Sequence, residues 1–459
     1  MQETNKKIVA TELGTDNVRK LLIKYAVPAI IAMTASSLYN IIDSIFIGQG
    51  VGAMAISGLA ITFPLMNLTA AFGSLVGVGA STLISVRLGQ KDYDTAQRIL
   101  GNVVTMNIIL GLVLGAVILL ALDPILYFFG ASEATIPYAR DFMVVILLGN
   151  VVTHMYLGLN AILRSAGHPR EAMMATITTV AVNVVLAPLF IYAFHWGIRG
   201  AALATVLAQI VALCWQIRLL SNKEELLHLQ RGIYRLKRRI VADSLAIGMS
   251  PFLMNLAACL IVILINKGLK EYGGDFAIGA FGIVNRVSFV FVMIVIGLNQ
   301  GMQPIAGYNF GAQQFDRVKR VVKLTMLCAT VVTTFGFVVG ELCPALVASA
   351  FTSDEQLISL SAEGMRLVVA VFPIVGFQMV ITNFFQSIGM ANKAIFLSLT
   401  RQLLFLLPCL IVLPPLMNSW LGDGAFGVWL SMPISDFLAT AVAVVMYRLQ
   451  IKKFAAMAR

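Results

Sequence analysis

A single aspartate lies deep inside an apolar stretch near the start of the chain. Asp43 occurs in the sequence SLYNIIDSIFIGQG, which contains no other charged residue. An ionisable side chain inside a membrane helix is costly and marks a functional site by default. A carboxylate in a low dielectric gains affinity for a proton, and with neutral oxygens beside it the same group could hold a sodium ion. We therefore expect Asp43 to bind a coupling ion; the alternative is a structural hydrogen bond that locks helix packing.

Neutral polar side chains that could assist Asp43 occur beside it and in later apolar stretches. Tyr39 and Asn40 lie one helical turn before Asp43, on the same side of the helix. Asn160, Asn183 and Thr205 fall in three further apolar stretches. Each of these, taken alone, is more typical of hydrogen bonding between helices.

The second half of the chain carries its own polar candidates. Its carboxylate is Asp436, in WLSMPISDF. The alternative for Asp436 is local polar repair, because Pro433 leaves a helix carbonyl without its usual partner. Polar groups expected to line a substrate cavity are Asn40 from the first half and Gln303, Gln378, Asn383 and Asp436 from the second.

Motifs of soluble chemistry do not occur. The sequence has no Walker loop, no HExxH and no serine nucleophile elbow. Its five cysteines show no CxxC spacing, and its four histidines are scattered. We expect no cofactor and no metal site, apart from sodium at Asp43 if sodium is the coupling ion. An ATP-driven pump is unsupported, which leaves transport driven by an ion gradient.

The composition indicates that these residues are carried by membrane helices. Of the 459 residues, 59% are hydrophobic and 12% are charged, about half the charged fraction of a soluble domain. A helix needs about 20 apolar residues to cross a bilayer. Twelve segments qualify, and they cover approximately residues 18–47, 55–86, 96–121, 137–164, 169–194, 197–220, 240–268, 278–308, 318–344, 357–388, 392–417 and 423–449.

The basic residues predict the orientation of these segments. Most of the 33 Lys and Arg residues fall before the first segment, after every even-numbered segment, and at the C-terminus. Cytoplasmic loops carry such an excess of positive charge. We therefore expect a multi-pass protein of the cytoplasmic (inner) membrane with both termini in the cytoplasm, and the net charge of +11 needs no nucleic acid partner.

The two halves of the chain repeat one another. Gly89 matches Gly311 and Asp94 matches Asp316, both 222 residues apart, while Asp43 lands on Asn266 at 223. Gly200 matches Gly427 at 227, so extra residues lie around the eleventh segment. Six segments per copy give a parallel repeat, which is typical of transporters. We expect a six-helix lobe over 1–220, a cytoplasmic linker over 221–239, and a second six-helix lobe over 240–459.

These segments together resemble the multidrug and toxic compound extrusion family, in its MepA-like branch. The resemblance covers nearly the whole chain. It rests on LYNIIDSIFIGQG from Leu38, RLGQKDYDTAQ from Arg87, LNAILRSAGHPREAM from Leu159, NVVLAPLFIYAFHWGIRGAALATVLAQ from Asn183, GLNQGMQPIAGYNFGA from Gly297 and GVWLSMPISD from Gly427.

The resemblance implies an all-α membrane protein of twelve transmembrane helices in two pseudo-symmetric lobes, V-shaped around a central cavity. It implies export of amphipathic, often cationic compounds in exchange for protons or sodium ions. The family's helix-1 carboxylate falls on Asp43 and its bending proline on Pro28. Its polar cluster in the first lobe falls on Tyr39, Asn160, Asn183 and Thr205.

One position departs from the family pattern. The usual Leu-Asp-Pro of the fifth helix here reads Leu186-Ala187-Pro188. A second carboxylate is therefore absent, and Asp43 must bind its ion without one. This leaves the coupling ion open between proton and sodium.

Two other functions compete with drug export. A flippase for lipid-linked oligosaccharides, from the same wider superfamily, would need a more cationic cavity than Arg286, Arg366 and Arg401 provide. A membrane-embedded enzyme would need His, Asp or Glu clustered at one depth, and none is visible. We expect a monomer in contact with membrane lipid and small-molecule substrates.

Overall fold

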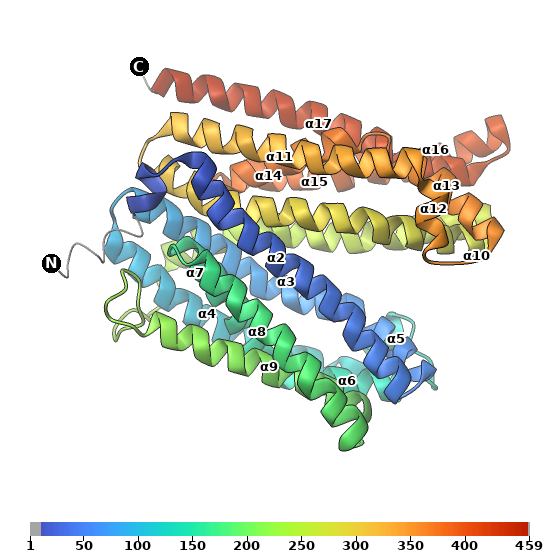
Figure 1. The fold of residues 1–459 in the computed structure, drawn as a ribbon, viewed down its shortest axis with the longest axis horizontal. Helices are drawn as coiled ribbons and strands as arrows, with labels where there is room; N and C mark the ends of the chain where they lie inside the picture. Colours follow the sequence, from blue (N-terminus) through green and yellow to red (C-terminus); the bar gives the residue numbers. More distant parts are fainter. Residues whose placement is uncertain (1–10, 458–459) are drawn as a thin grey trace. The chain divides into compact units, whose positions relative to one another are not determined.

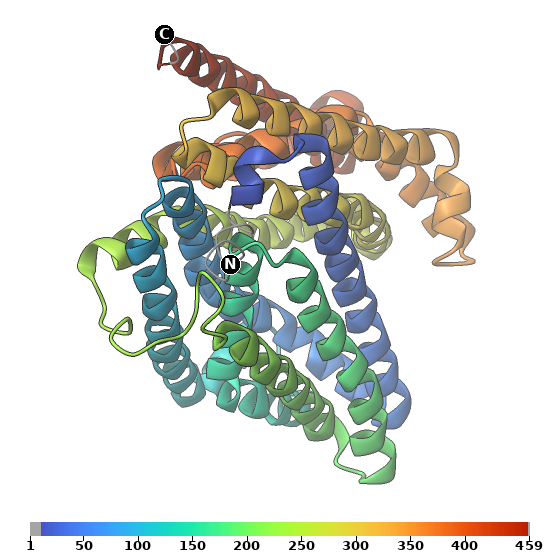
Figure 2. The ribbon, with the colours of Figure 1, turned by 60° about the vertical axis from the view of Figure 1, so that its left-hand side comes forward.

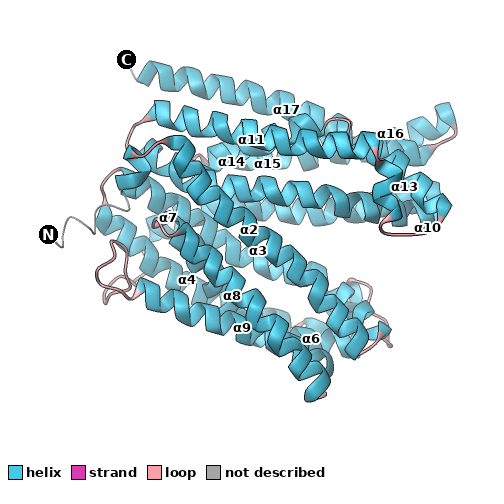
Figure 3. Cartoon of the chain, viewed as in Figure 1, coloured by secondary structure: helices cyan, strands magenta, loops and turns pink. Residues whose placement is uncertain are grey.

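The chain is helical throughout the part that the structure describes, residues 11–457. This computed structural model shows no strand in those residues, and its loops are confined to helix ends (Figure 3). The helices in chain order are α2 (Val18–Gly50), α3 (Ala53–Gly89), α4 (Tyr93–Leu120), α5 (Leu122–Phe128), α6 (Ile136–Leu148), α7 (Asn150–Ser165), α8 (Pro169–Pro188), η1 (Leu189–Ala193), α9 (Gly197–Leu220), α10 (Arg238–Gly311), α11 (Phe315–Leu342), α12 (Pro344–Ser349), α13 (Glu355–Val369), α14 (Phe372–Ser387), α15 (Ala391–Leu399), η2 (Thr400–Leu406), α16 (Leu407–Leu421) and α17 (Gly424–Met457).

Ten of the described helices are long and apolar enough to cross a membrane, and two bent pairs bring the number to as many as twelve. All twelve predicted segments fall on these helices. The bent pairs are α6 with α7, at 58°, and α13 with α14, at 52°. These two breaks were not predicted, since hydropathy continues across them. Pro373 explains the second, because a proline tolerated in the first turn of α14 cannot continue a helix that arrives from α13.

Helix α4 exposes apolar side chains and buries two asparagines, the reverse of a helix on the surface of a soluble protein. The exposed apolar side chains Ile109, Leu112, Val113 and Val117 recur at helical spacing along one face, with between 47% and 60% of each exposed. The buried face carries Asn102 and Asn107, which are fully covered. An apolar outer face and a polar inner face suit lipid rather than water as the surrounding medium.

Contacts divide the chain into two units. Unit 1 comprises Met1–Phe252 and Gly307–Gln314, and unit 2 comprises Leu253–Ala306 and Phe315–Arg459. In unit 1, α3 packs on α7 and α4, while α2 packs on α8 and α8 on α9; these helices run alongside one another in Figure 1. In unit 2, α11 packs on α14, and α17 packs on α14 and α16. The division into lobes at 1–220 and 240–459 stays a prediction.

Repeat-related glycines pack against each other inside unit 1. A Cβ atom on Gly89 of α3 would collide with the carbonyl oxygen of Tyr308, and one on Gly311 would collide with that of Val86. Gly89 and Gly311 are matched by the repeat, and so are Val86 and Tyr308, both 222 residues apart. The ends of α3 and α10 therefore meet backbone to backbone in a contact that the repeat maps onto itself, and only glycine fits there.

The connection between α9 and α10 is fastened to α4 by polar side chains. The Gln97 amide donates to the carbonyl of His228 and accepts from the N–H of His228 at 3.2 Å. Asn102 accepts from the N–H of Lys237 at 2.9 Å and donates to the carbonyl of Arg235 at 3.2 Å. Figure 2 shows this connection as a loop running alongside α4. The connection is therefore held against α4 of unit 1 by side-chain hydrogen bonds.

His168 makes a second attachment of the same connection. Its Nε2 lies 3.0 Å from the Glu225 carboxylate, and its Nδ1 lies 3.7 Å from that of Glu171 in the first turn of α8. The Glu171 carboxylate first, and then that of Glu225, raise the pKa of His168, against the opposing effect of burial. Protonated His168 thus bridges α8 and the connection.

Replacing Asn102 tests whether its hydrogen bonds to the connection stabilise the protein. The variant Asn102→Ala leaves one backbone N–H and at least one carbonyl of the connection without partners. We expect a loss of about 1–3 kcal/mol of stability, measured as a lower midpoint of thermal unfolding in detergent. The matched control is Asn222→Ala, because the exposed Asn222 side chain bonds locally, accepting from the N–H of Glu224 two residues further on. Equal unfolding midpoints for the two variants would show that the Asn102 hydrogen bonds do not stabilise the protein.

His168 makes the stability of the protein depend on pH, and replacing it removes that dependence. A raised pKa means that the ion pairs stabilise the fold below about pH 6.5 and that this stabilisation disappears as pH rises through the raised pKa. For His168→Gln we expect a loss of about 1 kcal/mol or less at pH 5.5 and almost none at pH 9. Thermal unfolding at both pH values measures it, with the exposed His195→Gln as control. A difference that does not vary with pH would show that His168 acts by packing alone.

Candidate ion-coupling site

Asp43 is buried without a cationic partner. It lies in α2, seven residues before the end of that helix, and only 8% of it is exposed. Its Oδ1 atom is buried and has no hydrogen-bond partner within the described chain. No described Lys, Arg or His pairs with it. A carboxylate in this setting is costly in its ionised form unless a cation neutralises it.

Three neutral side chains from three helices form a closed triad one turn from Asp43. Asn183 of α8 donates to the Tyr39 hydroxyl at 2.9 Å and to the Thr205 hydroxyl at 3.0 Å. The hydroxyl oxygens of Tyr39 and Thr205 are themselves 2.8 Å apart. The structure thus brings Tyr39, Asn183 and Thr205 together, and Tyr39 precedes Asp43 by four residues on one helix. Their role in ion coupling stays a prediction.

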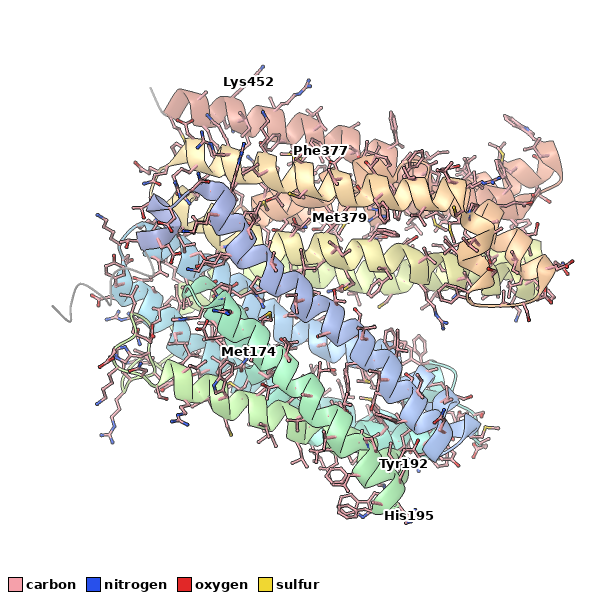
Figure 4. All side chains as sticks on the ribbon, in the orientation of Figure 1. Met174, Tyr192, His195, Phe377, Met379 and Lys452 are labelled. Atoms are coloured by element: carbon pink, nitrogen blue, oxygen red, sulfur yellow. The ribbon has the colours of Figure 1, made fainter. Side chains whose placement is uncertain are left out.

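The packing of α8 between α2 and α9 positions this triad. One hydrogen bond joins α8 to α2, that of Asn183 with Tyr39. A second, beyond Asp43, joins η1 to α2, because the Tyr192 hydroxyl donates to the Phe46 carbonyl at 3.2 Å. Figure 4 labels Tyr192 and His195 at the end of this helix and Met174 nearer its start. Asp43 lies on α2 between these two attachments.

Asn160 belongs to a different network. Its amide donates to the Ala172 carbonyl at 2.9 Å, and its Oδ1 accepts from Arg164 at 2.5 Å. It also contacts the Thr176 hydroxyl, which accepts from Tyr156. The structure gives no hydrogen bond between Asn160 and the triad. The sequence analysis placed Asn160 in one polar cluster with Tyr39, Asn183 and Thr205 and did not name Arg164 or Thr176 as its partners.

Ala187 occupies the place where the family pattern has aspartate. It is fully buried and packs with Ala204 of α9 and Phe190, beside Phe46 of α2. It lies one turn after Asn183 on α8. The second carboxylate is replaced here by an apolar contact among three helices.

Two further predicted residues of α2 lie outside the triad. The side chain of Asn40 is exposed, and its carbonyl accepts from Ser44. Pro28 is buried inside α2, which continues as one helix through it from Val18 to Gly50. The bend expected at Pro28 stays a prediction.

The predicted cavity residues of unit 2 make separate contacts. Gln378 donates to Thr382 at 3.3 Å, and Asn383 accepts from Ser387 at 3.2 Å, both within α14. Gln303 is buried in α10. Asp436 of α17 accepts from the Nε of Arg401 at 2.5 Å. The sequence analysis named Arg401 only as a cationic residue and did not predict its partner.

The described residues contain no group of three or more His, Cys, Asp or Glu side chains arranged to hold a metal ion. The polar groups of unit 1 are instead one carboxylate and a set of neutral oxygens and amides. Such a site can bind and release a small cation, and offers no nucleophile or acid–base pair.

A carboxylate without a cationic partner inside a bundle of membrane helices marks a functional site, such as part of an ion or substrate pathway. The MatE family model matches residues 28–189 and 247–411, which is more than half of the chain. The chain therefore belongs to the MatE family, whose members are membrane transporters and not enzymes.

Curated relatives and solved structures agree with this membership. The chain is 26% identical over 428 residues to the multidrug export protein MepA of Staphylococcus haemolyticus (strain JCSC1435), covering 93% of both. It is 26% identical over 438 residues to MepA of Staphylococcus aureus (strain NCTC 8325 / PS 47), covering 94% of both. A crystal structure of a MATE protein in a bent conformation superposes with a TM-score of 0.91 at 23% identity, covering 98% of both chains. An outward-facing multidrug resistance MATE transporter superposes with a TM-score of 0.90 at 23% identity, covering 97% of this chain and 99% of that one.

A double-mutant cycle on Tyr39 and Thr205 tests the triad. Tyr39→Phe and Thr205→Val each remove one hydroxyl and preserve the side-chain shape. We expect a coupling energy of about 1 kcal/mol, as is typical of hydrogen bonds between membrane helices, measured by thermal unfolding of the four proteins. Thr179→Val is the control for Thr205→Val, because Thr179 bonds only to the carbonyl of Ala175. Additive effects would mean that the hydroxyls do not interact.

Proposed function

We propose that this protein exports amphipathic, often cationic drug-like compounds across the cytoplasmic membrane, driven by an inward flow of protons that bind Asp43. The observation that carries the proposal is the buried Asp43 carboxylate, which has no cationic partner among the described residues and stands beside a closed neutral triad. The names of the MepA relatives, which are multidrug export proteins, support the cargo class.

The arrangement of oxygens supports the proton over the sodium ion. A sodium ion needs several oxygen ligands around it. Of the four neutral groups expected to supply them, the Asn160 oxygen accepts from Arg164, and the Tyr39 and Thr205 hydroxyls bond to each other and accept from the Asn183 nitrogen. The Asn183 oxygen, which takes part in none of these bonds, is one neutral ligand and falls short of a sodium shell. A proton needs only the carboxylate. The apolar contact at Ala187 also leaves sodium without a second anionic ligand.

The proposed cycle follows from charge neutralisation. A proton taken up from outside neutralises Asp43, which removes the cost of the buried charge and favours tighter packing of α2 in unit 1. Helix α2 bends near Pro28, and the drug leaves to the outside. The two lobes then alternate in access, the proton is released to the cytoplasm, and new drug binds. In this proposal the chain acts as a monomer in contact with lipid, with both termini in the cytoplasm.

The test is ethidium efflux from vesicles of purified protein, with a proton gradient or a sodium gradient imposed separately. We expect the proton gradient alone to drive efflux. Asp43→Asn should lower the driven rate by about tenfold or more, because an amide cannot exchange a proton, and should leave ethidium binding intact. Asp123→Asn is the control, because this surface carboxylate pairs with Arg140 at 2.8 Å.

Two results would contradict the proposal. One is a normal driven rate in Asp43→Asn. The other is efflux that depends on sodium, or that appears only in Ala187→Asp. Efflux that appears only in Ala187→Asp would mean that a carboxylate at position 187 of α8 governs coupling, despite the cost of placing a charge among Ala204, Phe190 and Phe46.

A further inference from the structure

The two buried carboxylates occupy positions that the repeat does not match. Asp43 corresponds to Asn266 at 223 residues, and Asp436 corresponds to Gln209 at 227. Among the described residues, Asp43 and Asp436 are the only acidic side chains in the buried class. Each unit therefore has one buried carboxylate where the other has an amide, and the two sites can serve different purposes.

Asp436 differs from Asp43 in having a cationic partner. The Nε of Arg401 donates to Asp436 Oδ1 at 2.5 Å, and 6% of the Asp436 side chain and 32% of the Arg401 side chain are exposed. The pair cancels its own charge, so unit 2 has no unpaired buried carboxylate like that of unit 1. The pairing with Arg401 by itself explains how the Asp436 carboxylate can be buried, without a role for Asp436 in ion coupling.

The guanidinium of Arg401 is only partly used by this pair. Arg140 shows the full arrangement elsewhere in the chain, where Nε and Nη2 donate to both oxygens of Asp123, each at 2.8 Å. Arg401 donates through Nε alone to one oxygen. Within the described chain its two Nη groups make no hydrogen bond. Donors of this kind, on a partly exposed guanidinium within a candidate membrane span, favour an anionic ligand.

Arg401 lies where the repeat has gained residues. It is the second residue of η2, a π-helical stretch within the span Ala391–Leu421. That span has 31 residues, whereas the corresponding span of unit 1, Pro169–Ala193, has 25. Its neighbour Gln402 also has a buried Oε1 without a partner in the described chain. π-helical insertions occur frequently at functional sites.

We propose that Arg401 binds the carboxylate group of a substrate, with Asp436 as the internal counter-ion that it partly releases. The planar guanidinium offers two parallel N–H donors to a carboxylate, which a lysine cannot match. The proposal deepens the export function and rests on it: the cargo would include zwitterionic amphiphiles as well as cations. Asp436 repels the incoming carboxylate, so it limits the affinity.

The opposing explanation is a structural ion pair that fastens η2 to α17. The two explanations predict opposite signs for one substitution. If the pair is structural, removing either partner weakens the protein and its binding alike. If Arg401 binds a carboxylate, removing Asp436 frees the guanidinium and strengthens binding of that carboxylate.

The experiment uses two dyes that differ only in this group. Rhodamine 110 has a free carboxyl group, and rhodamine 123 is its methyl ester. Fluorescence anisotropy with the purified full chain in lipid nanodiscs gives both dissociation constants. For Arg401→Gln we expect the constant for rhodamine 110 to rise about tenfold or more, as for loss of a charge-assisted hydrogen bond, and that for rhodamine 123 to change less than about twofold. For Asp436→Asn we expect tighter binding of rhodamine 110.

Two further variants serve as controls for misfolding and for the loss of any arginine from unit 2. Arg401→Lys keeps the charge and the pair with Asp436 but lacks the planar donors, so it should fold and still lose the preference for rhodamine 110. Arg366→Gln, an exposed arginine of the same unit, should bind both dyes as the unchanged chain does.

Several outcomes would overturn the proposal. They are equal weakening of both dyes in Arg401→Gln and Asp436→Asn, normal rhodamine 110 binding in Arg401→Lys, or binding of the ester alone by the unchanged chain. The last leaves the export function standing. Conversely, the expected binding pattern without any gradient-driven efflux of rhodamine 123 would contradict the export function and support the carboxylate site.

Discussion

A carboxylate buried without a cation is the constraint around which unit 1 is organised. Asp43 is buried and its Oδ1 has no hydrogen-bond partner within the described chain, so an ionised Asp43 is poorly solvated. The neighbouring Tyr39 and Thr205 hydroxyls bond to each other and accept from the Asn183 amide nitrogen, and no hydrogen bond in the structure joins them to Asp43 Oδ1. In the proposed function, a cation that binds here stabilises the site and its departure destabilises it. That dependence is how ion binding would change helix packing.

The repeat supplies a symmetric scaffold, but the chemistry on it is not symmetric. Gly89 and Gly311 meet in a contact that the repeat maps onto itself. The carboxylates do not follow the repeat: one is unpaired in α2 and the other is paired with Arg401 in unit 2. The two copies of the repeat can thus differ in function: we propose ion binding in the first copy and recognition of a substrate carboxylate in the second.

The connection between α9 and α10 also has a definite place. Gln97 and Asn102 hold its backbone through amide groups, which can donate and accept at once. His168 and Glu225 add a charged attachment. These contacts assign the connection to unit 1, so movements of this unit carry the connection with them.

The sequence by itself determined the helices, their repeat and the position of the unpaired carboxylate. Apolar length fixes a membrane helix, because the backbone must satisfy its own hydrogen bonds in lipid, and a lone aspartate such as Asp43 stands out against that background. The tertiary structure alone decided which polar groups meet. Asn160 and Asn183 look alike in sequence, yet one bonds to Arg164 and the other to Tyr39, because the rotation of α7 and α8 about their axes is set by packing. In the same way, only packing brings Arg401 to Asp436 across 35 residues, since neither residue carries in its own sequence a sign of the partner that it meets.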